Sequence, residues 1–168
     1  EWVQTGTRVQ RVDGAKVVLE DGRSLPARAV VVATDGPEAA RLLGLPAAPA
    51  SVAETCLYFA CDRAGWHSPY LMLNGEGRGP INNVSFPSRV SPAYAPAGKS
   101  LASVVVLGNP DETNAVLLER VRRQLTDWFG MEVRRWQHLK TYRIVHALPD
   151  QQPPTHNPFR PDHRDRPG

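Results

Sequence analysis

Several residue types and patterns are rare or missing in this sequence, and each absence excludes a class of protein. Only two of the 168 residues are cysteines, and no spacing of cysteine and histidine resembles a zinc site. No apolar run approaches the roughly 20 residues that a membrane-spanning helix needs, and no signal-peptide pattern opens the chain. We therefore exclude a disulfide-rich scaffold and a helical membrane protein, and we predict no metal site.

Lysine is also scarce, since only Lys16, Lys99 and Lys140 are lysines among 20 basic residues. The formal net charge is +3, and the arginines are scattered apart from "RVRR" (120–123) and the last residues. A nucleic-acid-binding surface usually gathers basic and aromatic residues on one face. The pattern favours a solvated helix face instead, so no nucleic-acid partner is predicted. Salt-dependent retention on a polyanion would be the signature of the opposite case.

The two cysteines, Cys56 and Cys61, stand in the predicted strand "ETCLYFACD" (54–62). Their odd separation places them on opposite faces of a strand, so they cannot form a disulfide within it. Buried free thiols are typical of a reducing compartment. The sequence therefore predicts a cytoplasmic location, and it leaves peripheral contact with a membrane open.

The first 46 residues predict a small β-meander. Val9 and Val12 lie in a first strand, Asp13-Gly14 is a typical hairpin turn, and "AKVVLE" (15–20) forms a second strand. The run "ARAVVVA" (27–33) is apolar throughout, which is typical of a strand buried on both faces of a sheet. We expect this third strand of the meander to belong to a larger sheet whose two faces are both buried.

A short helix is predicted directly after that run. Asp35 and Glu38 have the spacing of a capping box, and Gly44 ends the helical pattern. The proline- and alanine-rich segment "LPAAPAS" (45–51) is then typical of a hinge between two structural units. The predicted organisation is a fragment of a cofactor-binding domain, a second domain and a proline-rich tail, with the ranges 1–46, 47–150 and 151–168.

The second unit predicts a sheet with one long helix. The helix runs from an N-cap at Asn109 to Phe129, and its apolar stripe is typical of core packing on a sheet. The stripe consists of Leu117, Val121, Leu125 and Trp128, and the predicted strands are 54–62, 70–75, 81–87, 101–108 and 134–149. We therefore predict an α+β fold, with a mixed or antiparallel sheet, a long helix packed on it and the small β-meander attached.

The run "TRVQRVDGAKVVLEDGRSLPARAVVVATDGPEAARLLG" (7–44) resembles the middle of flavin-dependent oxidoreductases. The superfamily is that of amine oxidases, phytoene desaturases and protoporphyrinogen oxidases, in which such a stretch forms the meander of the FAD domain. The later "WQHLKTYRIVHALP" (136–149) is similar to the end of the substrate domain of the same proteins. The resemblance covers nearly the whole chain and implies a fragment with the substrate-binding domain at its centre.

The resemblance implies FAD as the cofactor of the parent protein, with peripheral contacts in this chain. The backbone at Val9 would contact the adenine side of FAD, and Thr34 would lie near the cofactor. The G-x-G-x-x-G fingerprint that lets a backbone approach pyrophosphate is absent. We therefore expect the main FAD-binding motifs to lie elsewhere in the parent, and the turn at 34–36 not to hold a phosphate.

No catalytic residue can be named from the sequence. Many amine oxidases place a lysine near the flavin, and the corresponding place here, 54–56, holds no lysine. This departure leaves desaturase-like or porphyrinogen-oxidising chemistry more open than amine oxidation. Six residues are candidates for lining a substrate cavity, although ordinary packing or turn roles are the alternative for each. They are Tyr58, Tyr70, Asn82, Asn83, Tyr142 and His146.

The predicted function is thus the substrate-binding portion of an FAD-dependent oxidoreductase that oxidises C–C or C–N bonds of a hydrophobic substrate. The parent is expected to be an enzyme, and this chain by itself is expected to be inactive. The alternative is a stand-alone α+β module that binds an apolar ligand. Expected partners are the small-molecule substrate and the missing FAD-domain segments. An exposed apolar patch would also allow a homodimer.

Overall fold

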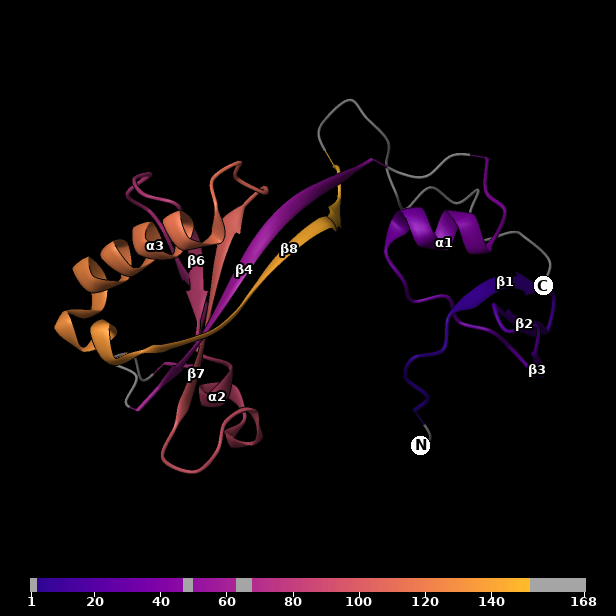
Figure 1. Cartoon of the computed structure of the whole chain (residues 1–168), viewed down its shortest axis with the longest axis horizontal. Coiled ribbons are helices and arrows are strands. Elements are labelled where there is room, and N and C mark those ends of the chain that lie inside the picture. The colour runs from indigo at the N-terminus through magenta and orange to yellow at the C-terminus, as the bar shows by residue number, and fades with distance from the viewer. Residues whose placement is uncertain (1–2, 47–49, 63–67, 152–168) are drawn as a thin grey trace. The chain divides into compact units, whose positions relative to one another are not determined.

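The computed structural model describes residues 3–46, 50–62 and 68–151, which divide into two units (Figure 1). The first unit comprises residues 1–52 and 146–168, and the second comprises residues 53–145. Helices and antiparallel strands alternate irregularly along the chain, which confirms the predicted α+β class. The predicted tail lies outside the described residues from position 152 onward, as do residues 47–49 of the predicted hinge.

The first unit contains the predicted meander and the short helix. Strands β1 (Val9–Asp13), β2 (Lys16–Leu19) and β3 (Ser24–Pro26) form an antiparallel sheet in that order. Asp13 pairs with Lys16 across the tight turn, where Gly14 adopts a φ of 55° that glycine tolerates. Helix α1 (Gly36–Leu42) begins at Asp35, whose side chain accepts a hydrogen bond from the Glu38 backbone N–H.

Arg41 joins helix α1 to the first strand. Its guanidinium donates to the carbonyl oxygens of Gln10 at 2.6 Å and Val9 at 2.9 Å, and it pairs with the Glu38 carboxylate. The Glu38 carboxylate therefore accepts from Arg41 and does not make the reciprocal bond to the Asp35 backbone N–H that a capping box requires. Beneath these contacts Leu19 and Leu42 are buried.

The prediction of a buried strand at 27–33 is wrong. Strand β3 ends at Pro26, and the structure assigns no strand to residues 27–33. The Val31 side chain is 87% exposed. A strand reaches burial on both faces only when other elements pair with it and cover it. Within the described residues no strand pairs with this run, so its apolar sequence does not become core.

The second unit is built on a five-stranded sheet in the order β5-β6-β7-β4-β8. The central strand β7 (Ser100–Leu107) pairs antiparallel with β4 (Ser51–Cys61) and with β6 (Ile81–Ser85). Short strand β5 (Met72–Leu73) pairs with β6, and long strand β8 (Gln137–Pro149) lies beside β4. All five strands fall within the predicted segments or overlap them.

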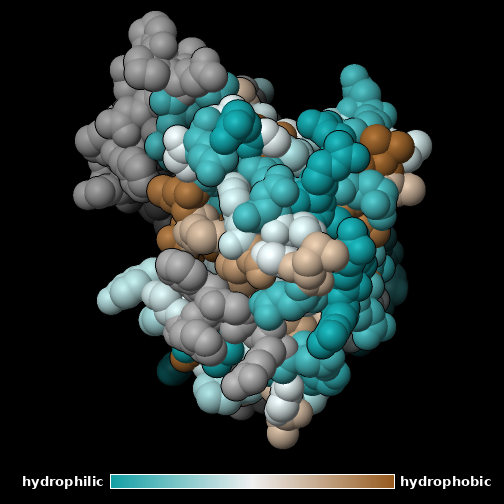
Figure 2. All heavy atoms as spheres, turned by 90° about the vertical axis from the view of Figure 1, so that its left-hand side faces the viewer, coloured by the Kyte–Doolittle hydropathy of each residue, from teal (hydrophilic) through white to brown (hydrophobic). Residues whose placement is uncertain are grey.

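Helix α3 (Asn114–Phe129) packs on one face of this sheet (Figure 1). Leu117, Val121 and Leu125 are fully buried against sheet residues such as Phe59 and Val104, which confirms the predicted apolar stripe. The opposite side of the helix faces solvent, and this side of the molecule is mostly hydrophilic (Figure 2). Three short elements complete the unit, namely α2 (Pro87–Val90), η1 (Pro92–Tyr94) and η2 (Met131–Arg135).

The long helix begins four residues later than its sequence suggests. Its N-cap is Thr113, whose Oγ1 accepts from the Val116 backbone N–H, and it ends before Gly130 as predicted. The predicted cap, Asn109, is engaged elsewhere: its side-chain amide lies 2.9 Å from Thr55 Oγ1 on β4. A tertiary contact therefore takes the side chain that local rules assign to the helix. No helix in the described part of the chain is long and apolar enough to cross a bilayer.

Candidate functional site

The sheet of the second unit presents two chemically different faces. Successive residues of a strand point to opposite faces, so Leu57 and Phe59 of β4 enter the core beneath α3. Cys56 and Tyr58 point to the other face, which we call the open sheet face. A cavity of about 480 Å³ lies on it. Its lining residues are Cys56, Tyr58, Leu101, Leu139, Lys140, Tyr142 and Ile144.

Two aromatic side chains from adjacent strands meet in this cavity. The rings of Tyr58 and Tyr142 are 5.8 Å apart between centroids and nearly perpendicular, at 85°. This edge-to-face arrangement is the favoured one for aromatic pairs. Tyr58 is half-buried and Tyr142 is 49% exposed, so the pair offers an apolar surface with two hydroxyl groups. The structure thus brings together two of the residues predicted from the sequence.

Lys140 is the one charged residue in the lining set. Its Nζ lies 5.7 Å from the centroid of the Tyr142 ring, which is within the range of a cation–π contact. Within the described residues, no ion pair or hydrogen bond involves the Lys140 ammonium group. The cavity therefore combines a mainly apolar wall with a single cation at the Tyr142 ring.

The thiol of Cys56 forms part of the cavity wall. Burial, followed by the hydrogen bond to Glu54, raises the pKa of Cys56 to about 11. The Sγ atom donates to Glu54 Oε1 at 3.4 Å. A thiol is reactive as its thiolate, so the neutral Cys56 contributes a small apolar surface to the cavity wall.

The other predicted lining residues lie outside this cavity. Tyr70 is 76% exposed and precedes β5. Asn82 and Asn83 lie on β6, where Asn83 is paired with Val105, and the Asn82 carbonyl accepts from the Asn74 backbone N–H. His146 belongs to the first unit, where its Nδ1 is 2.6 Å from Ser51 Oγ.

Sequence reasoning missed Lys140, Leu139 and Ile144 on β8, and Leu101 on β7. A period-two signal was available in "KTYRI" (140–144), because Lys140, Tyr142 and Ile144 alternate with Thr141 and Arg143. Arg143 points away from the cavity and donates to the backbone carbonyls of Pro110 and Glu112. This alternation identifies the lining residues on β8, but it does not indicate that β4 and β7 supply the rest of the cavity.

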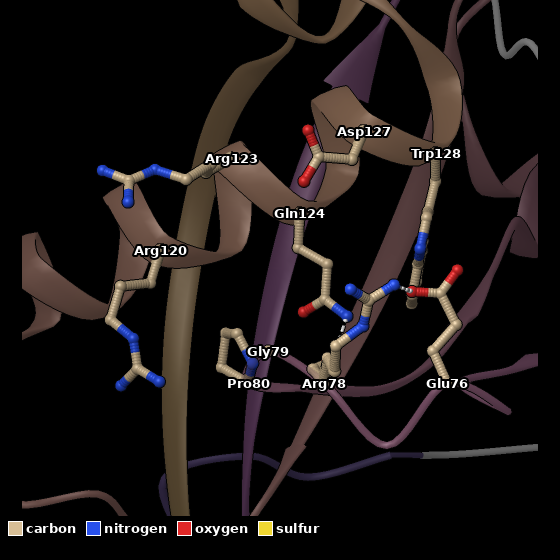
Figure 3. A pocket seen from close by; sticks show the side chains of 9 residues that line it. All are labelled: Glu76, Arg78, Gly79, Pro80, Arg120, Arg123, Gln124, Asp127 and Trp128. Atoms are coloured by element: carbon tan, nitrogen blue, oxygen red, sulfur yellow. Dashed lines mark hydrogen bonds and ion pairs between the residues drawn. The ribbon is translucent and has the colours of Figure 1, made fainter.

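A second hollow, of about 470 Å³, lies between helix α3 and the turn before β6 (Figure 3). Its walls are charged: Arg78 pairs with Glu76 at 3.2 Å, and Arg123 and Asp127 project from the helix. Beneath them the Gln124 side chain accepts from the Ile81 backbone N–H and donates to the Arg78 carbonyl. Gln124 thus fastens the helix to the turn before β6, and the hollow itself is lined mainly by charged side chains. The open sheet face is the better binding site.

Comparison with known proteins places the chain in a family. Its sequence matches, over residues 1–168, the family described as flavin containing amine oxidoreductase. The chain belongs to this family. No curated protein matched the sequence in a direct comparison.

Solved structures of other proteins share the fold. An oxidoreductase from Methanosarcina mazei is 18% identical with a TM-score of 0.60, and it is matched by 86% of this chain. Reduced UDP-galactopyranose mutase is 12% identical with a TM-score of 0.60, and it is matched by 88% of this chain. The chain spans 38% of the first structure and 36% of the second, so it corresponds to less than two fifths of either.

The family implies a flavin, but the N-terminus of helix α1 does not fit its phosphates. Helix α1 has seven residues, and the Asp35 carboxylate already caps its N-terminus. An acid at that position repels phosphate and competes for the backbone N–H groups. The two predicted FAD contacts are engaged within the chain. Thr34 is exposed, and its hydroxyl donates to the Asp35 carbonyl. The Val9 carbonyl accepts from the Arg41 guanidinium. We therefore assign no step of a reaction to these residues.

Proposed function

We propose that this chain is the substrate-binding portion of an FAD-dependent oxidoreductase, and that the open sheet face holds a hydrophobic substrate. The observation that carries this proposal is the cavity of about 480 Å³ with its tyrosine pair and aliphatic lining. Ligand sites are typically concave, mainly apolar and lined by a few polar groups. Membership of the flavin amine oxidoreductase family supports redox chemistry in the whole protein.

In enzymes of this kind the cofactor carries the redox chemistry, and the protein binds the substrate, orients it and excludes water. The residues of the open sheet face suit those tasks, because the Cys56 thiol is neutral and the tyrosines and aliphatic side chains shed water. We infer that the chain alone is inactive, since the N-terminus of helix α1 does not fit the phosphates of FAD.

The exposed run 27–33 supports a second part of the proposal, which concerns partners. We infer that Val31 and its neighbours pair with segments of the FAD domain that belong to the whole protein. The related structures are more than twice as long as this chain, and an exposed apolar run favours a partner. A homodimer through the same run is the competing arrangement in the isolated chain, and sedimentation velocity distinguishes monomer from dimer.

Binding of a neutral apolar probe, N-phenyl-1-naphthylamine, tests the substrate site by fluorescence. Ile144→Asp places a charge in the cavity and should weaken binding at least about tenfold, because the carboxylate would have to lose water on binding. Val145→Asp is the matched control, since Val145 is 61% exposed and does not line the cavity. Equal weakening by both variants would refute the open sheet face as the binding site.

A titration with FAD tests the statement that the chain alone is inactive. We expect flavin fluorescence to stay unchanged on addition of the chain, while the full-length protein purifies with flavin bound. Stoichiometric quenching by the chain alone would contradict this part of the proposal. If the full-length protein also lacks flavin, the alternative of a stand-alone apolar-ligand module becomes the better account.

A further inference from the structure

We propose that the substrate of the open sheet face is an amphipathic anion, an apolar molecule with a carboxylate at one end, and that Lys140 binds the carboxylate. The inference rests on the proposed function and narrows its substrate class. Its starting point is the composition of the cavity, in which six lining residues carry no charge and one carries a positive charge.

Lys140 has no acidic partner to satisfy it. Within the described residues it takes part in no ion pair, whereas Lys99 is paired with Asp62. Glu54 lies on the same face of β4 but is not among the lining residues, and its carboxylate accepts from Cys56. A cation without a counter-ion beside an apolar cavity favours a ligand that brings the negative charge with it.

The Tyr142 ring holds the ammonium group at the cavity. The Nζ atom lies 5.7 Å from the ring centroid, and a cation–π contact of this kind is worth more as water is removed. The lysine stem can lie along apolar surface while its charged end remains solvated. A bound carboxylate would meet the ammonium group at the rim, with the apolar part of the ligand over Tyr58 and Ile144.

The same geometry disfavours the other substrate classes. A protonated amine would be repelled by Lys140, because two like charges would lie close together at the rim of the cavity. A neutral hydrocarbon would leave the Lys140 ammonium group without a counter-ion. An apolar carboxylate avoids both costs.

Two fluorescent probes with the same polyene chain test the inference: cis-parinaric acid, which is a carboxylate, and its neutral methyl ester. The purified chain should bind the acid about fivefold more tightly than the ester at low salt, as expected for one partly exposed ion pair. Lys140→Met should abolish this preference by weakening the binding of the acid. Lys140→Arg should keep it, and raised salt should weaken it.

Lys99→Met is the matched control, because it removes the same charge from the same unit outside the cavity, and it should keep the preference for the acid. Equal binding of acid and ester by the wild-type chain, with no effect of Lys140→Met, would overturn the inference and leave the proposed function standing. Failure of both probes to bind would overturn the proposed function and the inference with it. Circular dichroism of each variant confirms that it is folded.

Discussion

A Cβ atom on Gly79 would overlap the side-chain amide of Gln124, which fastens the turn before β6 to helix α3 (Figure 3). The Gln124 Oε1 accepts from the Ile81 backbone N–H at 3.0 Å, and its Nε2 donates to the Arg78 carbonyl at 2.8 Å. Gln124 is only 8% exposed, so these bonds replace water that the buried groups have lost. A side chain at position 79 would therefore force the Gln124 amide to move from these two bonds.

Gly79→Ala should destabilise the chain more than Gly77→Ala. Both glycines have positive φ values, 76° and 64°, so each substitution costs about 1 kcal/mol of backbone strain. Alanine at 79 must also displace the Gln124 amide, which adds about 1–3 kcal/mol for buried polar groups left unpaired. Nothing lies within 4 Å of a Cβ at Gly77. Urea unfolding of the two variants measures the difference.

A double-mutant cycle separates the clash from the strain. In a Gln124→Ala background the amide is gone, so Gly79→Ala should cost no more than Gly77→Ala does. If the difference between the two glycine variants persists there, the overlap with Gln124 is not its cause.

Thr113→Ala should cost about 1 kcal/mol of stability, because the first turn of α3 loses its side-chain cap. Thr113→Ser keeps the hydroxyl and should stay within about 0.5 kcal/mol of the wild type. Urea unfolding followed by far-ultraviolet circular dichroism gives both values. If Thr113→Ala leaves the free energy of unfolding unchanged, the Thr113 side chain does not stabilise the first turn of α3.

Stability of the first unit should fall in acid through Glu38. The hydrogen bond and charge of Arg41 hold the pKa of Glu38 below its ordinary value of 4.5. A lowered pKa in the folded state means that the contribution is complete above about pH 4.5 and is lost as the pH falls through the folded value. Hydrogen exchange of the α1 amides, followed over this pH range, should show the loss.

Glu38→Gln should flatten that pH profile, because the titrating group is gone. Glu119→Gln is the control, since Glu119 forms no ion pair in the described part of the chain. A Glu38→Gln profile as steep as that of the wild type would assign the acid sensitivity to another carboxylate. Asp21, whose pKa is lowered by hydrogen bonds from Arg23, would then be the first to examine.

Both cysteines should react slowly with Ellman's reagent in the folded chain. Burial raises the pKa of Cys56 to about 11 and that of Cys61 to about 12, so well under about 1% of either thiol is ionised at pH 8. Reaction should be at least about 100-fold faster in urea, where the thiols regain ordinary pKa values. Fast labelling of a Cys61→Ser variant in native buffer would show that Cys56 is not protected.

Local pattern predicted most of the elements, for identifiable reasons. Leu117, Val121 and Leu125 repeat at helical spacing. A helix with such an apolar stripe buries it by packing that side against the core. The sequence pair Asp13-Gly14 predicted the hairpin, whose two-residue loop in the structure is Gly14-Ala15. Asp35 caps α1 because an aspartate before a proline-containing first turn has a backbone N–H within reach.

The errors arise where distant residues compete for the same group. Asn109 has the chemistry of a helix cap, but Thr55 on another strand holds its amide, and the cap passes to Thr113. The run 27–33 has the composition of a buried strand, but burial depends on strands that pair with it. Neither outcome can be read from neighbouring residues, because each depends on contacts between segments far apart in the chain.

The same distinction applies to the candidate site. Residue type predicted strands over 54–62 and 134–149, and it identified the strand aromatics Tyr58 and Tyr142 as candidates. Only the tertiary structure decided that these strands are adjacent, that the two rings meet edge to face, and that Lys140 lies over one of them. Sequence determines what each strand can bury, because side-chain chemistry and the period of two are local; strand order determines which side chains form a cavity, because pairing is not local.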